Sequence, residues 1–269
     1  MNKNKDKIIS LKRYICGYEE FNFPILYKKC SIPKKKLPIN VFMLEHRKYG
    51  TILINTGCSN LLKHNPVSFA KFLTKYSVTF TEEDFIDKQL EKDKLDPRIV
   101  RKVLLTHCDP QCCGGLKLLP RYELCSGAKV LTLVILCDPT DGLMPSVMPP
   151  QEVPKKAAGI FEGHTILKDY FKWVFDVFGD GSILAVDLPG HAKAMTGFFL
   201  PEKNIFFAAD ASIDESAIEN DLTPSSALLK SQCYPNDYSD TLNTLKSLKK
   251  DYPEITFLFT HSSFLMNNE

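Results

Sequence analysis

Apolar and polar positions alternate along several short segments of the chain, which is the spacing expected of β-strands with one buried face. The clearest pair covers residues 37–44 and 51–55, with Pro38 in the first segment and Gly50 in the short connection between them. This pattern predicts a β-hairpin. Further apolar runs predict strands at residues 101–105, 129–137, 182–187, 194–200, 204–209 and 255–260.

Helical spacing interrupts these strands. Thr81 and Asp84 form a capping-box start, and the apolar residues that follow share one helix face to about residue 91. Leucines at helical spacing predict a second helix at residues 238–250, and a shorter one is expected at residues 166–175. Residues 138–156 contain five prolines, so this segment is expected to be a loop. Runs of strands interrupted by helices favour a mixed domain with sheets packed between helical layers.

The composition narrows the classes of function. Hydrophobic residues make up 44% and charged residues 25% of the 269 residues, which is ordinary for a folded globular protein. The 34 basic and 32 acidic residues give a formal net charge of +2, too balanced to suggest a nucleic-acid-binding protein. The longest apolar run, residues 130–137, is much shorter than the roughly 18 residues of a membrane span, so no membrane insertion is expected.

Cysteine usage bears on the cellular compartment. The chain contains nine cysteines, and its first residues lead into no apolar segment of the signal-peptide type. An odd number of cysteines without an export signal favours reduced thiols. The predicted location is therefore the cytoplasm.

Residues that can bind a metal stand near the ends of four predicted strands. His107 and Asp109 follow one strand, and the others lead to His191, Asp210 and His261. Loops at strand ends can bring such groups together at one rim of a sheet. Imidazole, carboxylate and thiolate groups are the usual ligands of borderline divalent metals. Taken singly, each residue is also explained as a surface or hydrogen-bonded residue, so the residues alone leave the metal site open.

Five short segments form a pattern when they are taken in order: Ile52–Gly57, Val103–His107 followed by Gly114 and Gly115, Leu188–His191, Phe206–Asp210, and Phe257–His261. In this order they resemble the motifs of the metallo-β-lactamase superfamily, most closely its lactonase-like members, which include acyl-homoserine lactone hydrolases. The resemblance implies an α+β fold, an αββα sandwich in which two mixed β-sheets lie between helical layers. It also implies a single domain spanning residues 1–269, with the site at one rim of the two sheets.

The chain departs from the superfamily pattern H-x-H-x-D-H in three of its four positions. His107 keeps the first histidine, but the second histidine, the aspartate and the third histidine are replaced by Asp109, Gln111 and Cys112. Asn55 also stands where the superfamily has the aspartate of a D-T-G segment. Because Gln111 lacks a negative charge, the second of two metal positions is expected to fill less readily than the first.

The resemblance implies two neighbouring metal positions. The expected ligands are His107, Asp109, Cys112, His191, Asp210 and His261. Asp210 adjoins both positions, Cys112 and His261 belong to the second, and the other three residues line the first. The expected cofactor is one or two divalent metal ions, with zinc as the first choice and iron or manganese as alternatives.

Three functions follow from such a site. The first is a metal-dependent hydrolase of an ester, lactone or thioester, in which Asp109 or Asp210 must act as the base because the amide of Gln111 cannot. The second is a degenerate, non-hydrolytic protein that binds a ligand or a protein. The third and least favoured is a diiron-type redox protein.

The partner is expected to be a small molecule, partly apolar in character. Residues 138–175 are a candidate lid insertion, because the Pro-rich segment lies where a loop could overhang the site. An apolar wall would then be added by Phe161, Tyr170, Phe171 and Trp173, although such aromatic residues are more often simply part of the core.

Overall fold

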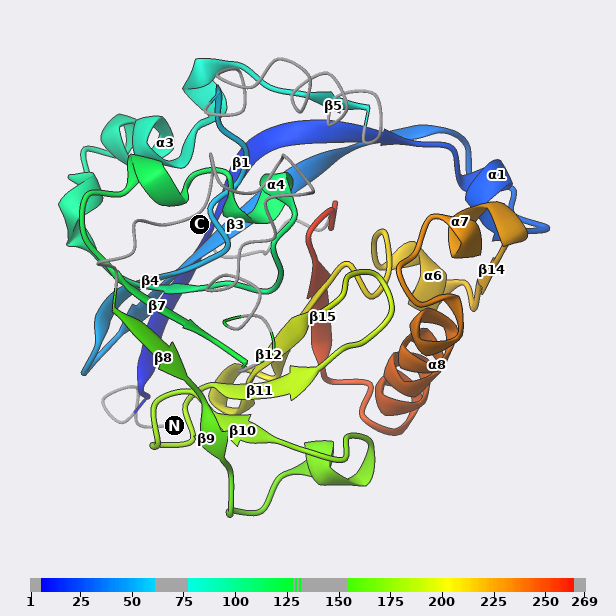
Figure 1. Ribbon diagram of the computed structural model, residues 1–269. Helices are drawn as coiled ribbons and strands as arrows, with labels where there is room; N and C mark the ends of the chain where they lie inside the picture. Colours follow the sequence, from blue (N-terminus) through cyan, green and yellow to red (C-terminus); the bar gives the residue numbers. More distant parts are fainter. Residues whose placement is uncertain (1–5, 61–76, 128, 130, 132–153, 264–269) are drawn as a thin grey trace.

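Two large β-sheets form the centre of the molecule (Figure 1). The computed structural model describes residues 6–60, 77–127, 129, 131 and 154–263. The first sheet has the strand order β5 (Val78–Thr79), β1 (Ile8–Phe21), β3 (Lys35–His46), β4 (Gly50–Ile54), β6 (Val100–Leu104), β7 (Glu123–Ser126) and β8 (Lys155–Ala157). The second has the order β15 (Thr256–Phe259), β13 (Ile205–Ala209), β12 (Thr196–Leu200), β11 (Leu184–Asp187), β10 (Phe175–Asp176) and β9 (Gly159–Ile160). A small third sheet pairs β14 (Thr223–Pro224) with β2 (Tyr27–Lys28).

Both large sheets are mixed. In the first, β1, β3 and β4 run antiparallel, whereas β4, β6, β7 and β8 run parallel. In the second, β13 and β15 run parallel and the other neighbours run antiparallel. Parallel strands place their carboxyl ends at the same edge of their sheet. The segments that follow β13 and β15 therefore begin at one edge of the second sheet, and the segment that follows β6 begins at an edge of the first.

The alternation of side chains along the strands explains why the two sheets stack. Successive residues of a strand point to opposite faces. On β3, Val41 packs on the outer face of the first sheet and Phe42 packs between the sheets; on β13, Phe206 and Phe207 divide in the same way. The rings of Phe42 and Phe207 meet with centroids 4.9 Å apart. One face of each sheet therefore forms the central core.

Helices cover the outer faces of the sandwich. On the first sheet, α3 (Ile86–Lys92) buries Ile86 and Leu90, and on the second, α8 (Pro235–Asp251) buries Leu245 and Leu248. Figure 1 shows these two helices on opposite sides of the molecule. The predicted α+β class and αββα layering are thereby confirmed. The remaining helices are short: α1 (Phe23–Leu26), α4 (Pro110–Cys113), α6 (Ser216–Glu219), α7 (Ser226–Lys230) and the 3-10 turns η2 (Glu82–Asp84), η3 (Pro97–Ile99), η4 (Leu116–Leu118), η6 (Ile166–Asp169) and η7 (Pro201–Lys203).

Backbone hydrogen bonds join the two sheets at one rim. The N–H of Asn40 on β3 donates to the carbonyl of Thr260 after β15 at 2.9 Å, and the N–H of Thr196 donates to the carbonyl of Thr106 after β6 at 2.8 Å. Thr106 and Thr260 each immediately precede a histidine of the predicted ligand set. These bonds therefore hold histidines from different sheets at the same rim.

The elements that the sequence predicts differ from the structure in two places. The strand at 129–137 is wrong where it is described, because Lys129 and Leu131 are helical and Leu131 N–H donates to the carbonyl of Gly127. The rest of that segment lies outside the described residues, and β7 is the strand that pairs with β6. The expected helix at 166–175 is only the turn η6.

The candidate lid at 138–175 falls partly outside the described residues, which resume at Pro154. Within the described part, β8 and β9 each extend one of the two large sheets. Phe171 stacks on Phe206 with ring centroids 6.1 Å apart, which favours the core interpretation for this aromatic residue. Trp173 is 51% exposed.

Across the described residues, no helix combines the length and apolar character needed to cross a membrane.

Candidate metal centre

The predicted metal ligands lie in loops that leave the two sheets at the joined rim. His107, Asp109 and Cys112 belong to the segment that follows β6 and runs into α4, and the ends of β11, β13 and β15 lead to His191, Asp210 and His261. Five of the six fall into two overlapping groups whose ligand atoms lie within 4.8 Å of one another: His107 with Asp109 and His191, and His107 with Cys112 and Asp210.

Four ligand atoms converge at the first of the two predicted positions. Asp210 Oδ2 lies 3.1 Å from His107 Nε2 and 3.5 Å from His191 Nε2. Asp109 Oδ2 lies 3.4 Å from His191 Nε2 and 4.0 Å from His107 Nε2. Each of the two carboxylates thus lies near both imidazoles, and each sheet contributes one histidine and one acid.

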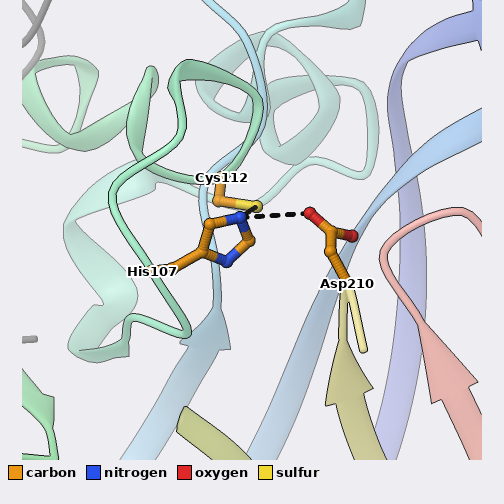
Figure 2. A group of neighbouring side chains, drawn as sticks. All are labelled: His107, Cys112 and Asp210. Carbon is orange, nitrogen blue, oxygen red and sulfur yellow. Dashed lines mark hydrogen bonds and ion pairs between the residues drawn. The ribbon is translucent and has the colours of Figure 1, made fainter. Parts of the chain in front are cut away.

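Cys112 extends this cluster toward the second position. Its Sγ lies 3.8 Å from His107 Nε2, and Figure 2 shows the thiol next to that ring nitrogen, which also faces the Asp210 carboxylate. The Cys112 side chain is fully buried. An imidazole nitrogen, a carboxylate and a thiol within 4.8 Å of one another form a donor set that suits zinc.

Each histidine is oriented by an oxygen that accepts a hydrogen bond from its Nδ1. The hydroxyl of Thr106 donates to Asn55 Oδ1 at 3.0 Å, so Thr106 Oγ1 accepts from His107 Nδ1 at 2.9 Å. The Asn55 orientation is fixed because its Oδ1 also accepts the backbone N–H of Thr106 at 3.0 Å. With Nδ1 as the donor, His107 presents Nε2 to the cluster.

His191 and His261 follow the same rule. Gln232 Nε2 donates to the carbonyl of Leu228, which leaves Gln232 Oε1 to accept from His191 Nδ1 at 3.0 Å. His261 Nδ1 donates to the carbonyl of Pro38 at 3.0 Å. Fixing the proton on Nδ1 leaves Nε2 as the atom that can bind a metal.

His261 lies apart from the first position. Its Nε2 is 3.5 Å from Gln111 Nε2 and 3.5 Å from Oε2 of Glu19, a residue on β1 that is 6% exposed. Glu19 belongs to none of the five sequence segments, so no motif marks it. Gln232 is likewise absent from those segments.

Charges at the cluster shift the ionisation of its members. Burial opposes the charge on His191, but the hydrogen bond with Asp109 and the charge of Asp210 raise its pKa to about 9. Burial also opposes the charge on Asp210, yet His107, His191 and His261 hold its pKa well below the usual range. Burial raises the pKa of the Cys112 thiol well above its usual value. The Asp210 charge is therefore retained while the Cys112 thiol keeps its proton.

The residues fit a divalent metal ion. Nitrogen and oxygen ligands about 2.1 Å from a tetrahedral ion lie about 3.4 Å from each other; three of the four separations here, 3.1, 3.4 and 3.5 Å, are close to this, and the fourth, between His107 and Asp109, is 4.0 Å. Both carboxylate oxygens of Asp210 are buried and receive no hydrogen bond from the described residues, although His107 is near. A buried carboxylate is costly unless a cation or donors compensate it, so a metal ion accounts for this arrangement.

Close packing of loops holds the ligand segments in place. A Cβ on Gly115, just after α4, would lie 2.3 Å from the carbonyl oxygen of Thr56. Gly190, beside His191, has φ +133°, and a Cβ there would lie 2.3 Å from Tyr238 Cα on α8. Both positions require glycine, which explains the Gly-Gly and Pro-Gly-His segments in physical terms.

Comparison with known proteins identifies the fold. No family model matches the sequence, and no curated protein matches it either. Solved structures do match. An N-acyl homoserine lactone hydrolase, with the product N-hexanoyl-L-homoserine at its catalytic metal centre, is 16% identical, with 96% of this chain and 94% of that chain covered and a TM-score of 0.64. The hydrolase AbOPH of the beta lactamase superfamily is 13% identical, with 94% and 87% covered and a TM-score of 0.64.

This chain has the metallo-β-lactamase fold. AidC, a dizinc quorum-quenching lactonase, matches at 12% identity with 94% of this chain and 87% of that chain covered and a TM-score of 0.62. The predicted resemblance to lactonase-like members of the superfamily is confirmed at the level of the fold. Its structural neighbours are metal-dependent hydrolases, including lactonases.

Proposed function

We propose that this protein is a metal-dependent hydrolase of an ester, lactone or thioester, with an atypical metal site. The convergence of four ligand atoms from His107, Asp109, His191 and Asp210, at separations that suit one ion, carries the proposal. Solved proteins of the same fold support it, because they include a lactone hydrolase and a dizinc lactonase.

A divalent ion held by these residues would polarise a substrate carbonyl and lower the pKa of water to about 7. The chain's own contribution is orientation: Thr106 and Gln232 keep the Nδ1 protons of His107 and His191, so only the Nε2 atoms face the site. Orienting contacts of this kind keep imidazole ligands in the productive tautomer.

A base must take the proton of the attacking water, and the amide of Gln111 cannot do so. Asp109 and Asp210 are the two carboxylates at the first position, with side-chain exposures of 21% and 6%. The greater exposure of Asp109 gives substrate and water access to it. We assign the proton-accepting role to Asp109, which then returns the proton to the leaving oxygen or sulfur as its bond to the carbonyl carbon breaks.

Metal content tests the proposal first. The full chain, purified without chelator or affinity-tag metal, is compared by elemental analysis with Asp109→Ala and with Asp240→Ala, which removes an exposed carboxylate on α8. We expect about one or two zinc, manganese or iron ions per chain in the native protein and in Asp240→Ala, and a loss in Asp109→Ala. A native chain that stays metal-free after incubation with each ion contradicts the hydrolase proposal.

The metal-loaded chain is then assayed with N-hexanoyl homoserine lactone and with a p-nitrophenyl ester. Lactones come first because the solved lactone hydrolase of this fold holds a homoserine product. Hydrolysis that Asp109→Ala abolishes supports the need for this carboxylate at the site, as a ligand or as the base.

A non-hydrolytic binding protein is the second candidate. The observation that favours it is Gln111, whose side-chain nitrogen lies 3.5 Å from the Nε2 of His261 and offers a hydrogen bond where an ion would be held. Metal-free protein that nevertheless binds acyl homoserine lactone in a calorimeter would favour this function over hydrolysis.

A further inference from the structure

The two adjacent cysteines of α4 have opposite surroundings. Both side chains are fully buried. The Cys113 thiol donates to the carbonyl of Cys108 at 3.2 Å and packs in the outer core of the first sheet. Cys112 belongs to none of the hydrophobic clusters that the described residues form, and its Sγ lies 3.8 Å from His107 Nε2. Packing therefore explains Cys113, whereas Cys112 faces the candidate metal centre.

Backbone hydrogen bonds fix the position of Cys112. Its carbonyl accepts the N–H of Thr56 at 2.7 Å and the hydroxyl of Thr56 at 3.1 Å, and its own N–H donates to the carbonyl of Asp109 at 2.8 Å. One rotatable bond connects the backbone of a cysteine to its sulfur, so a fixed backbone leaves three staggered positions. The position adopted here directs the sulfur to His107.

The separations around Cys112 suit donors to a single ion. A nitrogen about 2.1 Å and a sulfur about 2.3 Å from a tetrahedral ion lie about 3.6 Å apart, and 3.8 Å separates Cys112 Sγ from His107 Nε2. The ligand atoms of His107, Cys112 and Asp210 all lie within 4.8 Å of one another. Asp210 Oδ2 is also 3.5 Å from His191 Nε2, so the thiol has its two neighbours in common with the first metal position.

We propose that the Cys112 thiolate binds the first ion, the one held by His107 and Asp210. It would not join His261 at a second position. The inference rests on the proposed function, because it adds a sulfur donor to the same centre. Binding replaces the Sγ–H bond by an Sγ–metal bond and releases the proton to water. A thiolate among these donors selects zinc over manganese, because manganese prefers oxygen ligands.

Burial supports a sulfur ligand on the inner side of the ion. Cys112 is fully buried, whereas the side chains of Asp109 and His191 are 21% and 19% exposed. The thiolate would therefore approach from the interior, where the charge of the ion compensates it. The outer side, next to Asp109, stays accessible to water and substrate.

X-ray absorption tests the proposal on the native chain, loaded with one equivalent of zinc. We expect one sulfur atom at about 2.3 Å from zinc, together with nitrogen and oxygen donors. Bound zinc without a sulfur neighbour overturns the proposal, makes Cys112 a hydrogen-bonded thiol beside His107, and leaves the proposed hydrolase standing. A native chain that binds no metal ion overturns both.

Cobalt in place of zinc identifies the sulfur, because a thiolate bound to cobalt gives a near-ultraviolet charge-transfer band. Cys112→Ser removes the sulfur and keeps the shape. Cys113→Ser is the matched control, because that thiol is equally buried and a hydroxyl can still donate to the Cys108 carbonyl. We expect the band in the native chain and in Cys113→Ser, and its loss in Cys112→Ser. A band that persists in Cys112→Ser overturns the proposal.

Competition between zinc and manganese tests the selectivity. In Cys112→Ser the affinity for zinc should fall by more than about tenfold relative to that for manganese, since even residues behind the ligands contribute that much to metal affinity. An equal loss for both ions overturns the selective role of the sulfur. Circular dichroism checks the fold of each variant, and the X-ray absorption of the native chain decides the proposal even where Cys112→Ser does not fold.

Discussion

Single residues behind the ligands decide which atom of each imidazole faces the site. Thr106, Gln232 and Pro38 each present an oxygen whose remaining contacts fix it as an acceptor for an Nδ1 proton. Each Nδ1 proton is therefore held away from the site, and each Nε2 faces it. Gln232 is a positioning residue in this scheme, because it touches His191 and not the ion.

Replacing Gln232 tests this positioning role. Gln232→Ala removes the acceptor for His191 Nδ1, so zinc affinity at the first position should fall by about 10- to 100-fold. Gln232→Glu keeps an acceptor and should retain native affinity, which a purely structural role would not predict. Competition with a chelating indicator measures both variants. Equal zinc affinity in Gln232→Ala and the native chain would contradict the role.

The sequence predicts residues that stand next to strand ends and misses those brought in by long-range pairing. His107, Asp109, Cys112, His191 and Asp210 lie together in the structure as the motifs implied, and their role as ligands stays a prediction. No local pattern marks Glu19, because its contact with His261 depends on how β1 pairs with β3 and how the two sheets join.

At the scale of elements, alternation predicted the β3–β4 hairpin, and apolar runs predicted β6, β13 and β15. The apolar run at residues 129–137 was misleading, because such a run without alternation suits a buried helix as well as a strand. Neither signal predicted β1, whose pairing with β3 contains irregular registers.

The turn between β3 and β4 depends on a neutral histidine. His46 Nδ1 accepts the backbone N–H groups of Lys48 and Tyr49 at 3.1 and 3.2 Å, while its Nε2 lies 3.1 Å from Ser182 Oγ. Burial lowers the pKa of His46 below its usual value, and Asp180 opposes this only in part. Protonating His46 Nδ1 would place its own N–H against the backbone N–H groups of Lys48 and Tyr49, so both hydrogen bonds would be lost.

This contact makes stability depend on pH. The unfolded chain binds a proton at His46 near pH 6.5, whereas the folded chain binds it only at lower pH, so the unfolding free energy falls as pH drops below about 6.5. His46→Leu should cost about 2 kcal/mol at pH 8 and flatten that dependence, as measured by urea unfolding from pH 8 to 5. Exposed His164→Ala is the control and should keep the native slope. A slope unchanged in His46→Leu would assign the acid sensitivity elsewhere.

At the scale of the whole molecule, the candidate metal centre joins the two halves of the sandwich. His107, Asp109 and Cys112 extend from the first sheet, and His191, Asp210 and His261 extend from the second. The unfolded chain cannot bring these groups together, so an ion that binds them favours the folded state of both sheets at once. Metal binding should therefore raise the stability of the entire chain and not only of the rim.

The size of this effect follows from mass action. Free zinc at 100 times its dissociation constant should add about 2.7 kcal/mol, which raises the melting temperature of a chain of this size by about 5–10 °C. Thermal unfolding with zinc and with excess chelator measures the difference, and Asp109→Ala should reduce it. Because the ligands come from both sheets, near-ultraviolet and far-ultraviolet circular dichroism should shift together. A shift in the near-ultraviolet signal alone would mean that the ion orders side-chain packing without stabilising the backbone of the sheets, which contradicts the prediction.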